Sequence, residues 1–216
     1  MPAKAITDFA KRALDLATAV IGIVLLSPIM LFIALMIRWR MGSPVLFRQR
    51  RPGYHARPFT MLKFRTMTVG DTAATGYSDA ARLTPLGASL RRYSLDELPQ
   101  FWNALKGEMS LVGPRPLLTE YLERYTPQQA RRHEVKPGVT GWAQVQGRQD
   151  IPFSRRLELD VWYVDHQSFW LDLKILWLTL MKIFRGTGVR SGQDVRAVDD
   201  LGLHPATRKG GGGAHD

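Results

Sequence analysis

The feature that most constrains the fold is a run without charged side chains from Leu16 to Ile37. As a helix, its 22 residues are long enough to cross roughly 30 Å of hydrocarbon. The run is too long for a signal peptide, and no small-residue cleavage site follows it. It therefore predicts a helix embedded in a membrane.

Two features of this run leave its path through the membrane open. Ser27-Pro28 lies at its middle, where proline removes a helical hydrogen bond. Basic residues flank both ends: Lys4, Lys11 and Arg12 before it, and Arg38, Arg40, Arg48, Arg50 and Arg51 after it. A spanning helix is expected to show a charge asymmetry, so this pattern favours a re-entrant helix with both ends in the cytoplasm. A kinked spanning helix is the equal alternative, because proline is common in membrane helices.

Charge and composition narrow the range of partners. The chain has 216 residues, which suits one domain, and a net charge of +11. Such a basic chain is expected to bind anions, which could be phospholipid, nucleic acid or phosphorylated substrates. The chain has no cysteine, so disulfides and thiolate metal sites are excluded.

Two adjacent carboxylates, Asp96 and Glu97, follow the arginine pair Arg91-Arg92 within the segment Ser94 to Gln100. Because proline is tolerated only in the first turn of a helix, Pro99 predicts a helix that begins at about Asp96. Lys106-Gly107 is a typical helix end. Asp96 would then lie near the N-cap, where anions bind well. The alternative is that Asp96 only caps the helix and Glu97 only matches its dipole.

The other elements predict an α+β fold that is mostly helical. Two short strands, 44–49 and 58–66, enclose a turn at Pro52-Gly53, and Thr84-Pro85 begins a helix that ends at Arg91-Arg92. Further helices are expected over 117–132, interrupted near Pro127, over 151–166 and over 172–185, with a polar loop over 70–81. In the last helix, Trp170, Leu173, Trp177 and Leu180 share one side. This pattern is typical of a helix in the membrane interface or of an amphipathic core helix.

Two further segments are candidates for phosphate binding. Arg115 is held between Pro114 and Pro116, which suits a bidentate phosphate clamp or a rigid turn facing water. The glycine-rich stretch 136–148 is typical of a tight loop approaching a ligand or of a hairpin. Lys63 on the second strand fits a phosphate ligand or a solvated strand face.

Four motifs occur in order along the chain. They are Lys63-Phe64-Arg65-Thr66-Met67, the run from Leu90 to Gln100, Gly113-Pro114-Arg115-Pro116, and the run from Lys136 to Gln144. Together they resemble those of the bacterial sugar transferases, small monotopic phosphoglycosyltransferases that begin glycan assembly on a polyprenyl phosphate. The resemblance covers about residues 5–190. One departure is Gln146, where the family usually has asparagine.

The resemblance implies an organisation in three parts. Residues 1–40 would form a re-entrant membrane helix broken at Ser27-Pro28, and residues 41–190 the catalytic domain. Residues 191–216 read as a disordered tail. A short β-hairpin and interfacial amphipathic helices would surround an active site on the cytoplasmic face of the bacterial inner membrane.

The resemblance also implies a reaction. The aspartate matching Asp96 attacks the β-phosphate of a UDP-sugar, UMP leaves, and polyprenyl (undecaprenyl) phosphate takes up the sugar-phosphate. Glu97 is assigned to acid/base, metal or acceptor handling. Mg²⁺ is the implied cofactor, with Asp96 as its protein ligand. The implied substrate-binding residues are Lys63, Arg91, Arg115, Gln144 and Arg148.

Two other classes of function are the alternatives. One is a basic membrane-attached scaffold without catalysis. The other is a nucleic-acid-binding protein, which the absence of a standard motif and the clustering of charge beside the apolar run disfavour. The identity of the sugar, the downstream glycan and the formation of a homodimer stay open.

Overall fold

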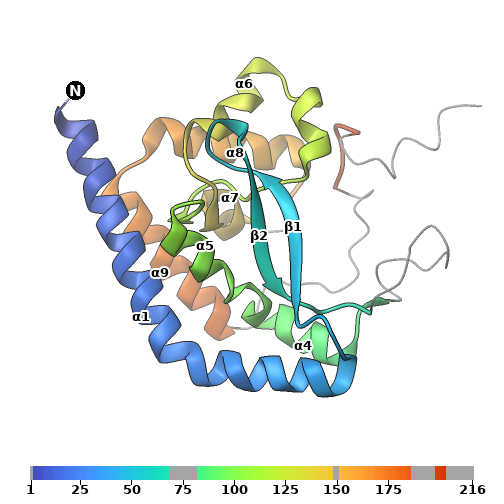
Figure 1. Cartoon of the computed structure of the whole chain (residues 1–216). Coiled ribbons are helices and arrows are strands. Elements are labelled where there is room, and N and C mark those ends of the chain that lie inside the picture. Colours follow the sequence, from blue (N-terminus) through green and yellow to red (C-terminus); the bar gives the residue numbers. More distant parts are fainter. Residues whose placement is uncertain (1, 69–81, 148–150, 186–197, 203–216) are drawn as a thin grey trace, which may run out of the picture.

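The computed structural model of the chain describes residues 2–68, 82–147, 151–185 and 198–202. The described part is mostly helical (Figure 1). Its α-helices are α1 (Pro2–Met41), α4 (Pro85–Arg92), α5 (Gln100–Lys106), α6 (Pro127–Ala130), α7 (Trp142–Gln146), α8 (Phe153–His166) and α9 (Phe169–Arg185). The 3-10 helices η1 (Tyr54–Ala56), η2 (Leu95–Glu97), η3 (Thr119–Arg124) and η4 (Arg131–Glu134) connect them. The strands are β1 (Leu46–Pro52), β2 (Pro58–Phe64), β3 (Ser110–Val112) and β4 (Gly138–Thr140).

The long helix α1 bends near its middle, so that two arms lie along two sides of the molecule (Figure 1). Pro28 lies inside α1 and leaves the carbonyl four residues earlier, that of Val24, without its helical donor. The Ser27 hydroxyl donates to this carbonyl at 2.8 Å. The Ser27-Pro28 pair therefore supplies both a cause of a bend and a partner for the freed carbonyl.

The first arm of α1 is bound to the rest of the molecule by polar side chains. Lys11 Nζ donates to the carbonyl of Val112 at 2.9 Å and pairs with Asp172 Oδ2 at 2.6 Å. Asp15 Oδ1 accepts from the backbone N–H of Leu111 at 2.8 Å. Lys11, which the sequence presented as a flanking charge, is thus a buried anchor.

The second arm of α1 joins the same body. Ile33 and Ile37 are buried against Phe64 of β2 and Leu90 of α4. Beyond the helix end, the Arg65 guanidinium donates to the backbone carbonyl of Gly42 at 2.8 Å and to that of Ser43 at 3.0 Å. Both ends of the apolar run therefore contact one compact unit.

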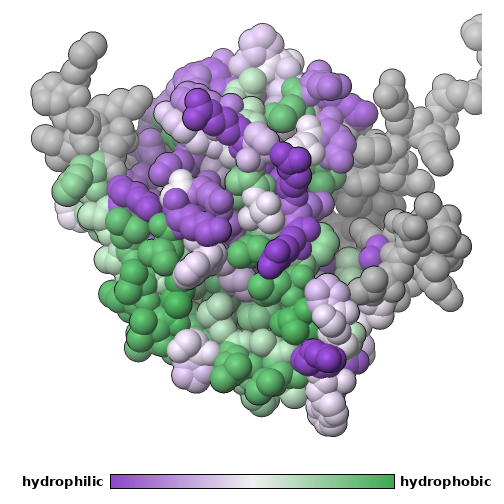
Figure 2. Space-filling view, in the orientation of Figure 1, coloured by the Kyte–Doolittle hydropathy of each residue, from purple (hydrophilic) through white to green (hydrophobic). Residues whose placement is uncertain are grey.

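The outer side of α1 is apolar and exposed. Phe9–Met41 is long and apolar enough to cross a membrane by length and composition, and only 11% of its most apolar window is buried. The exposed large side chains are Phe9, Leu16, Val20, Ile21, Val24, Leu25, Ile29, Leu31, Phe32, Leu35 and Trp39. Figure 2 shows hydrophobic residues gathered on the lower left and bottom of the molecule, and mostly hydrophilic residues above.

The hairpin and α4 confirm the corresponding predictions. β1 and β2 pair antiparallel, from Leu46 opposite Phe64 to Pro52 opposite Pro58. Thr84 caps α4, because its hydroxyl accepts from the backbone N–H of Gly87 at 3.0 Å. The helix ends at Arg92 as expected.

Two predictions about local structure were wrong. The predicted helix over 117–132 is instead a chain of short pieces, η3, α6 and the start of η4. The described part of the glycine-rich stretch, 136–147, is not a hairpin, because β4 pairs parallel with β3 and α7 follows directly. That this stretch approaches a ligand stays a prediction. The glycines there allow close packing of backbone: a Cβ on Gly138 would lie 2.1 Å from the nitrogen of Gly113.

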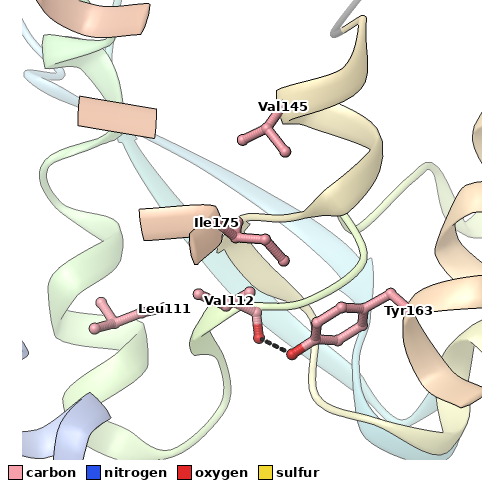
Figure 3. Packing of buried hydrophobic residues seen from close by; sticks show 5 residues of the cluster. All are labelled: Leu111, Val112, Val145, Tyr163 and Ile175. Atoms are coloured by element: carbon pink, nitrogen blue, oxygen red, sulfur yellow. Dashed lines mark hydrogen bonds between the residues drawn. The ribbon is translucent and has the colours of Figure 1, made fainter. Parts of the chain in front are cut away.

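The core joins β3 to the last two long helices. Leu111 and Val112 pack with Val145, Tyr163 and Ile175, and the Tyr163 hydroxyl donates to the Val112 carbonyl at 3.2 Å (Figure 3). α9 thus buries one side in the core, while Trp170 and Trp177 on its other side are 78% and 63% exposed. The core alternative is confirmed for one side of this helix, while the placement of its exposed apolar side in a membrane interface stays a prediction.

The predicted loop 70–81 and most of the predicted tail lie outside the described residues. Of the tail, the structure describes 198–202, where the Val198 carbonyl accepts from the backbone N–H of Phe153 at 2.8 Å.

Candidate active site

The two carboxylates lie on the single turn η2, before the α-helix rather than at its start. α5 begins at Gln100 and has Pro99 as its N-cap residue, so the predicted helix start at Asp96 was wrong by four residues. Ser94 precedes the turn in the left-handed region, at φ 56°. The predicted end was right, because Gly107 closes α5 at φ 80°. Asp96 is therefore not an N-cap of α5, and its position depends on the turn.

Glu97 is the centre of an ion-pair cluster. Its Oε1 atom lies 2.7 Å from Lys63 Nζ and 2.6 Å from Arg115 Nη2. Burial alone would raise the pKa of Glu97, but Arg115 and Lys63 hold that pKa far below its usual range. Glu97 is therefore ionised at neutral pH, and its ion pairs connect β2 to the Pro114-Arg115-Pro116 segment.

Asp96 has the opposite environment. It is 7% exposed, and its carboxylate makes no hydrogen bond or ion pair with any residue that the structure describes. Burial and the neighbouring charge of Glu97 raise the pKa of Asp96, while Lys63, Arg115 and Arg91 act in the opposite direction. A buried carboxylate with unused lone pairs, surrounded by cations, is a candidate nucleophile.

Arg91 and Lys63 are held close to the acidic turn by neighbouring elements. Arg91 Nε donates to Thr66 Oγ1 at 3.0 Å, which fixes the guanidinium just after β2. On the other side, Asn103 of α5 accepts from the backbone N–H of Leu62 at 3.0 Å. This contact sets α5, and the turn η2 that precedes it, against the strand that carries Lys63.

Arg115 is positioned by residues that the sequence did not single out. Arg132 Nη2 donates to the backbone carbonyl of Arg115 at 2.6 Å. The same guanidinium pairs with Asp160 Oδ2 at 2.7 Å and donates to the Tyr125 hydroxyl at 3.2 Å. Arg132 and Asp160 are both almost fully buried. No local pattern pairs these positions, so sequence reasoning had no signal for them.

The remaining predicted site residues are not all in the cluster. The side-chain amide of Gln144 is buried on α7, and neither of its polar atoms has a partner among the described residues. Arg148 lies outside the described residues. Ser27 and Pro28 lie within α1. The structure thus brings together Lys63, Arg91, Asp96, Glu97 and Arg115.

The carboxylates of this site suit a metal ion that takes most of its ligands from the substrate. Among the described residues there is no group of three or more His, Cys, Asp or Glu side chains that could hold a metal ion. Mg²⁺ commonly binds through one or two carboxylates, with water and substrate phosphates completing its shell. The unpaired carboxylate of Asp96 fits that role, whereas Glu97 Oε1 is already shared by two cations.

An open cavity of about 490 Å³ lies between α7 and α8. Its aromatic wall contains Trp142 and Trp162, which stack with ring centroids 5.2 Å apart. Gln146, the departure from the family motif, also lines it. No described residue of the predicted catalytic and substrate-binding set lines it.

Comparisons with known proteins identify the family. The chain matches the bacterial sugar transferase family over residues 6–186. It is 53% identical over 188 residues to the uncharacterized sugar transferase EpsL of Bacillus subtilis, covering 87% of this chain and 93% of that protein. It is 40% identical to the UDP-glucose:undecaprenyl-phosphate glucose-1-phosphate transferase of Escherichia coli, over 85% of this chain and 42% of that protein. It is 35% identical to the undecaprenyl-phosphate galactose phosphotransferase of Salmonella typhimurium, over 86% of this chain and 43% of that protein.

These matches identify the chain as a transferase. The chain belongs to the bacterial sugar transferase family. It spans nearly the whole of EpsL but less than half of the two relatives whose names state a donor or sugar. Its exposed apolar helix and this membership indicate association with a membrane.

Proposed function

We propose that this chain transfers a sugar-1-phosphate from a UDP-sugar to polyprenyl phosphate, with Asp96 as the covalent nucleophile. The observation that carries the proposal is the contrast between two adjacent carboxylates. Glu97 is neutralised by Lys63 and Arg115, whereas Asp96 is buried without a hydrogen-bond or ion-pair partner in the described structure. Relatives whose names state undecaprenyl-phosphate sugar transfer support the substrate class.

The reaction has two displacements at one phosphorus atom. A carboxylate oxygen of Asp96 bonds to the β-phosphorus of the UDP-sugar, the bond to the bridging oxygen breaks, and UMP leaves with the electron pair. An oxygen of polyprenyl phosphate then attacks the same phosphorus, and the acyl phosphate bond breaks. Asp96 regains its carboxylate, and the product is a polyprenyl diphosphate sugar.

The cations around Asp96 supply the electrostatic part of catalysis. Lys63 and Arg115 are fixed by Glu97, so their remaining N–H groups are oriented before substrate binds. Arg91 adds a third positive charge. A bound Mg²⁺ would neutralise phosphate charge beside Asp96. Glu97 acts in this scheme by positioning two cations.

We also propose that α1 is re-entrant, so that residues 1–40 form a membrane helix and 41–190 a catalytic domain on the cytoplasmic face of the inner membrane. Lys11 is bound to Val112 and Asp172, and Arg65 is bound to the chain just after α1. A straight spanning helix would place these two ends on opposite sides of the bilayer, and one set of contacts would be lost. The membrane would cover the exposed apolar side of the two arms.

Intact-protein mass spectrometry tests the covalent step. Protein incubated with Mg²⁺ and a panel of UDP-sugars, without polyprenyl phosphate, should gain one sugar-phosphate with the correct donor and release UMP. Asp96→Asn keeps the shape of the side chain but removes its charge, so it should gain no mass. An adduct on the Asp96→Asn variant would place the nucleophile elsewhere. Transfer by the wild type without any adduct would indicate a single displacement in a ternary complex. If the Asp96→Asn variant kept full activity, the scaffold alternative, in which Asp96 is dispensable, would be favoured.

A further inference from the structure

Two arginines near Arg115 have no anionic partner in the described structure. Arg51, at the end of β1, donates from Nη2 to Gln49 Oε1 at 2.6 Å and from Nη1 to the Pro116 carbonyl at 3.4 Å. Arg156, on α8, donates from Nη2 to the Ile151 carbonyl at 3.1 Å. All of these acceptors are neutral. Both side chains belong to partly exposed residues, so an anion from solvent can approach them.

The surroundings of these guanidinium groups are unfavourable to positive charge. Burial, and then the charge of Arg115, lower the pKa of Arg51 to about 10. Burial is also the main cause of the lowered pKa of Arg156, and its Nε atom is buried without a partner in the described structure. The carboxylate that acts on Arg156, Asp160, is already bound by Arg132 at 2.7 Å. Uncompensated charge costs folding free energy, and such conflicts are found preferentially at functional sites.

Arg115 is linked both to the acidic turn and to these two arginines. Its guanidinium contacts Glu97 at 2.6 Å. Its charge also acts on both Arg51 and Arg156, and Arg51 contacts the carbonyl of the next residue, Pro116. Tyr121 also acts electrostatically on both arginines. Positive charge therefore continues from the acidic turn through Arg115 to Arg51 and Arg156.

We infer that Arg51 and Arg156 bind the nucleotide phosphate that leaves as part of UMP. This inference rests on the proposed function. In an in-line displacement, the leaving oxygen lies opposite the nucleophile. Arg115 acts on Asp96 and also on Arg51 and Arg156, whereas these two arginines are not among the cations that act most strongly on Asp96. They therefore suit the phosphate on the far side of the reacting phosphorus from Asp96. Guanidinium forks match two oxygens of a phosphate group, and they need no carboxylate partner once that group is bound.

Direct binding of UMP to the purified protein tests this assignment. Arg51→Gln and Arg156→Gln should each weaken UMP binding about tenfold or more, measured by calorimetry. The KM for the UDP-sugar should rise by a similar factor, while the KM for polyprenyl phosphate stays within about twofold of the wild type. Arg50→Gln, at the adjacent exposed position of β1, and Arg131→Gln, whose guanidinium pairs with Asp165, remove the same charge as matched controls. Both should bind UMP like the wild type.

Three results would overturn the inference. Unchanged UMP affinity in both variants would mean that no nucleotide phosphate binds there. A rise in the KM for polyprenyl phosphate alone would assign the site to the lipid phosphate. An equal loss of UMP affinity in the two control variants would mean that only the overall positive charge of the protein matters. Because binding is measured without turnover, arginine-dependent UMP binding in a protein that forms no adduct would contradict the proposed function alone. Adduct formation with unchanged UMP binding in the variants would contradict this inference alone.

Discussion

The guanidinium of Arg132 holds the main chain of Arg115, through a hydrogen bond of 2.6 Å from Nη2 to the Arg115 carbonyl. Asp160 fixes Arg132 in turn, at 2.7 Å. The chain Asp160–Arg132–Arg115–Glu97 thus runs from a buried ion pair on α8 to the acidic turn. Arg132 makes its contacts with Asp160, Tyr125 and the Arg115 carbonyl through several N–H donors of one guanidinium, which lysine cannot reproduce.

Arg132→Lys should therefore impair catalysis more than folding. Lysine can keep the charge opposite Asp160, but it loses the simultaneous contact with the Arg115 carbonyl. We expect adduct formation to slow by about 10- to 100-fold, the effect of one hydrogen bond to a charged group. Rapid-quench measurement of adduct formation at saturating UDP-sugar tests this. Tyr125→Phe removes a different contact of Arg132 and should react at nearly the wild-type rate. Equal slowing in both variants would argue against a specific role for the Arg115 contact.

The pH dependence of adduct formation should report on Asp96. Burial and the charge of Glu97 raise the pKa of Asp96, so the reactive carboxylate forms only above a pKa higher than that of an ordinary aspartate. The rate should rise with pH through this pKa and then level off. Arg91→Gln removes a cation that lowers the pKa of Asp96. It should therefore move the rising, acidic part of the pH–rate profile to higher pH.

Arg92→Gln is the matched control for that shift. Arg92 is exposed beside Tyr93, and it is not among the charges that act on Asp96. The pH–rate profile of the Arg92→Gln variant should rise at the same pH as that of the wild type. Two results would exclude Asp96 as the titrating group. One is a wild-type rate that rises at the pH expected for an ordinary aspartate, and the other is a rise at lower pH in the Arg91→Gln variant.

Asp96→Asn and Glu97→Gln should change thermal stability in opposite directions. The pKa of Asp96 is raised in the folded state, so its ionisation destabilises the fold at pH values above that pKa, and the penalty disappears at low pH. Removing the charge should stabilise the protein by about 1 kcal/mol, or roughly 2–4 °C at this length. The measurement is the Tm in detergent at neutral pH, and a lower Tm for Asp96→Asn would contradict this account.

Glu97→Gln should instead lower the Tm. The pKa of Glu97 is lowered in the folded state, so its charge stabilises the fold above the unfolded pKa, and this contribution is lost as the pH falls through the folded value. Removing one partner of a fully buried ion pair costs ~3–5 kcal/mol. We expect a smaller loss of unfolding free energy for Glu97→Gln, because the Arg115 side chain is 35% exposed. An unchanged Tm would mean that the two ion pairs contribute little.

The sequence predicted several helix ends correctly, because the signals for them lie within a few neighbouring residues. Thr84-Pro85 begins α4 and Gly107 ends α5, because caps and left-handed glycines act within one turn. Asp96 and Glu97 could be recognised as candidates, but their unequal environments could not. Which carboxylate meets Lys63 and Arg115 depends on the direction of side chains on η2, and on contacts 34 and 18 residues away.

Contacts distant in sequence account for what was missed. Lys11 and Asp172 are 161 positions apart, and nothing near either residue predicts their ion pair. The parallel pairing of β3 with β4 likewise turns the glycine-rich stretch into a packing element, since Gly138 and Gly141 lie against the backbone of Gly113. Short three-residue strands carry too little periodicity to be predicted.

The bend of α1 provides the test of membrane topology. Pro28 removes a helical hydrogen bond, and Ser27 supplies the Val24 carbonyl with another donor. The chain has no cysteine, so Lys4→Cys and Arg50→Cys introduce single labels before and after the apolar run. In right-side-out vesicles, an impermeant maleimide should label neither position, and in inverted vesicles it should label both. Labelling of one position in each preparation would establish a spanning helix.

Pro28→Ala should shift this balance towards a spanning helix. Alanine restores the N–H that bonds to the Val24 carbonyl, so a straight helix gains at this point about the 3 kcal/mol that an interior proline costs. The position-4 label should then become accessible in right-side-out vesicles for part of the protein, while the position-50 label stays inside. Ser27→Ala is the matched control, because it removes the alternative donor but leaves Pro28 in place, and it should remain re-entrant. The anchors Lys11–Asp172 and Arg65–Gly42 oppose straightening, so we expect a mixture in the Pro28→Ala variant. Identical labelling of wild type and Pro28→Ala would show that these anchors, and not the proline, determine the path of α1.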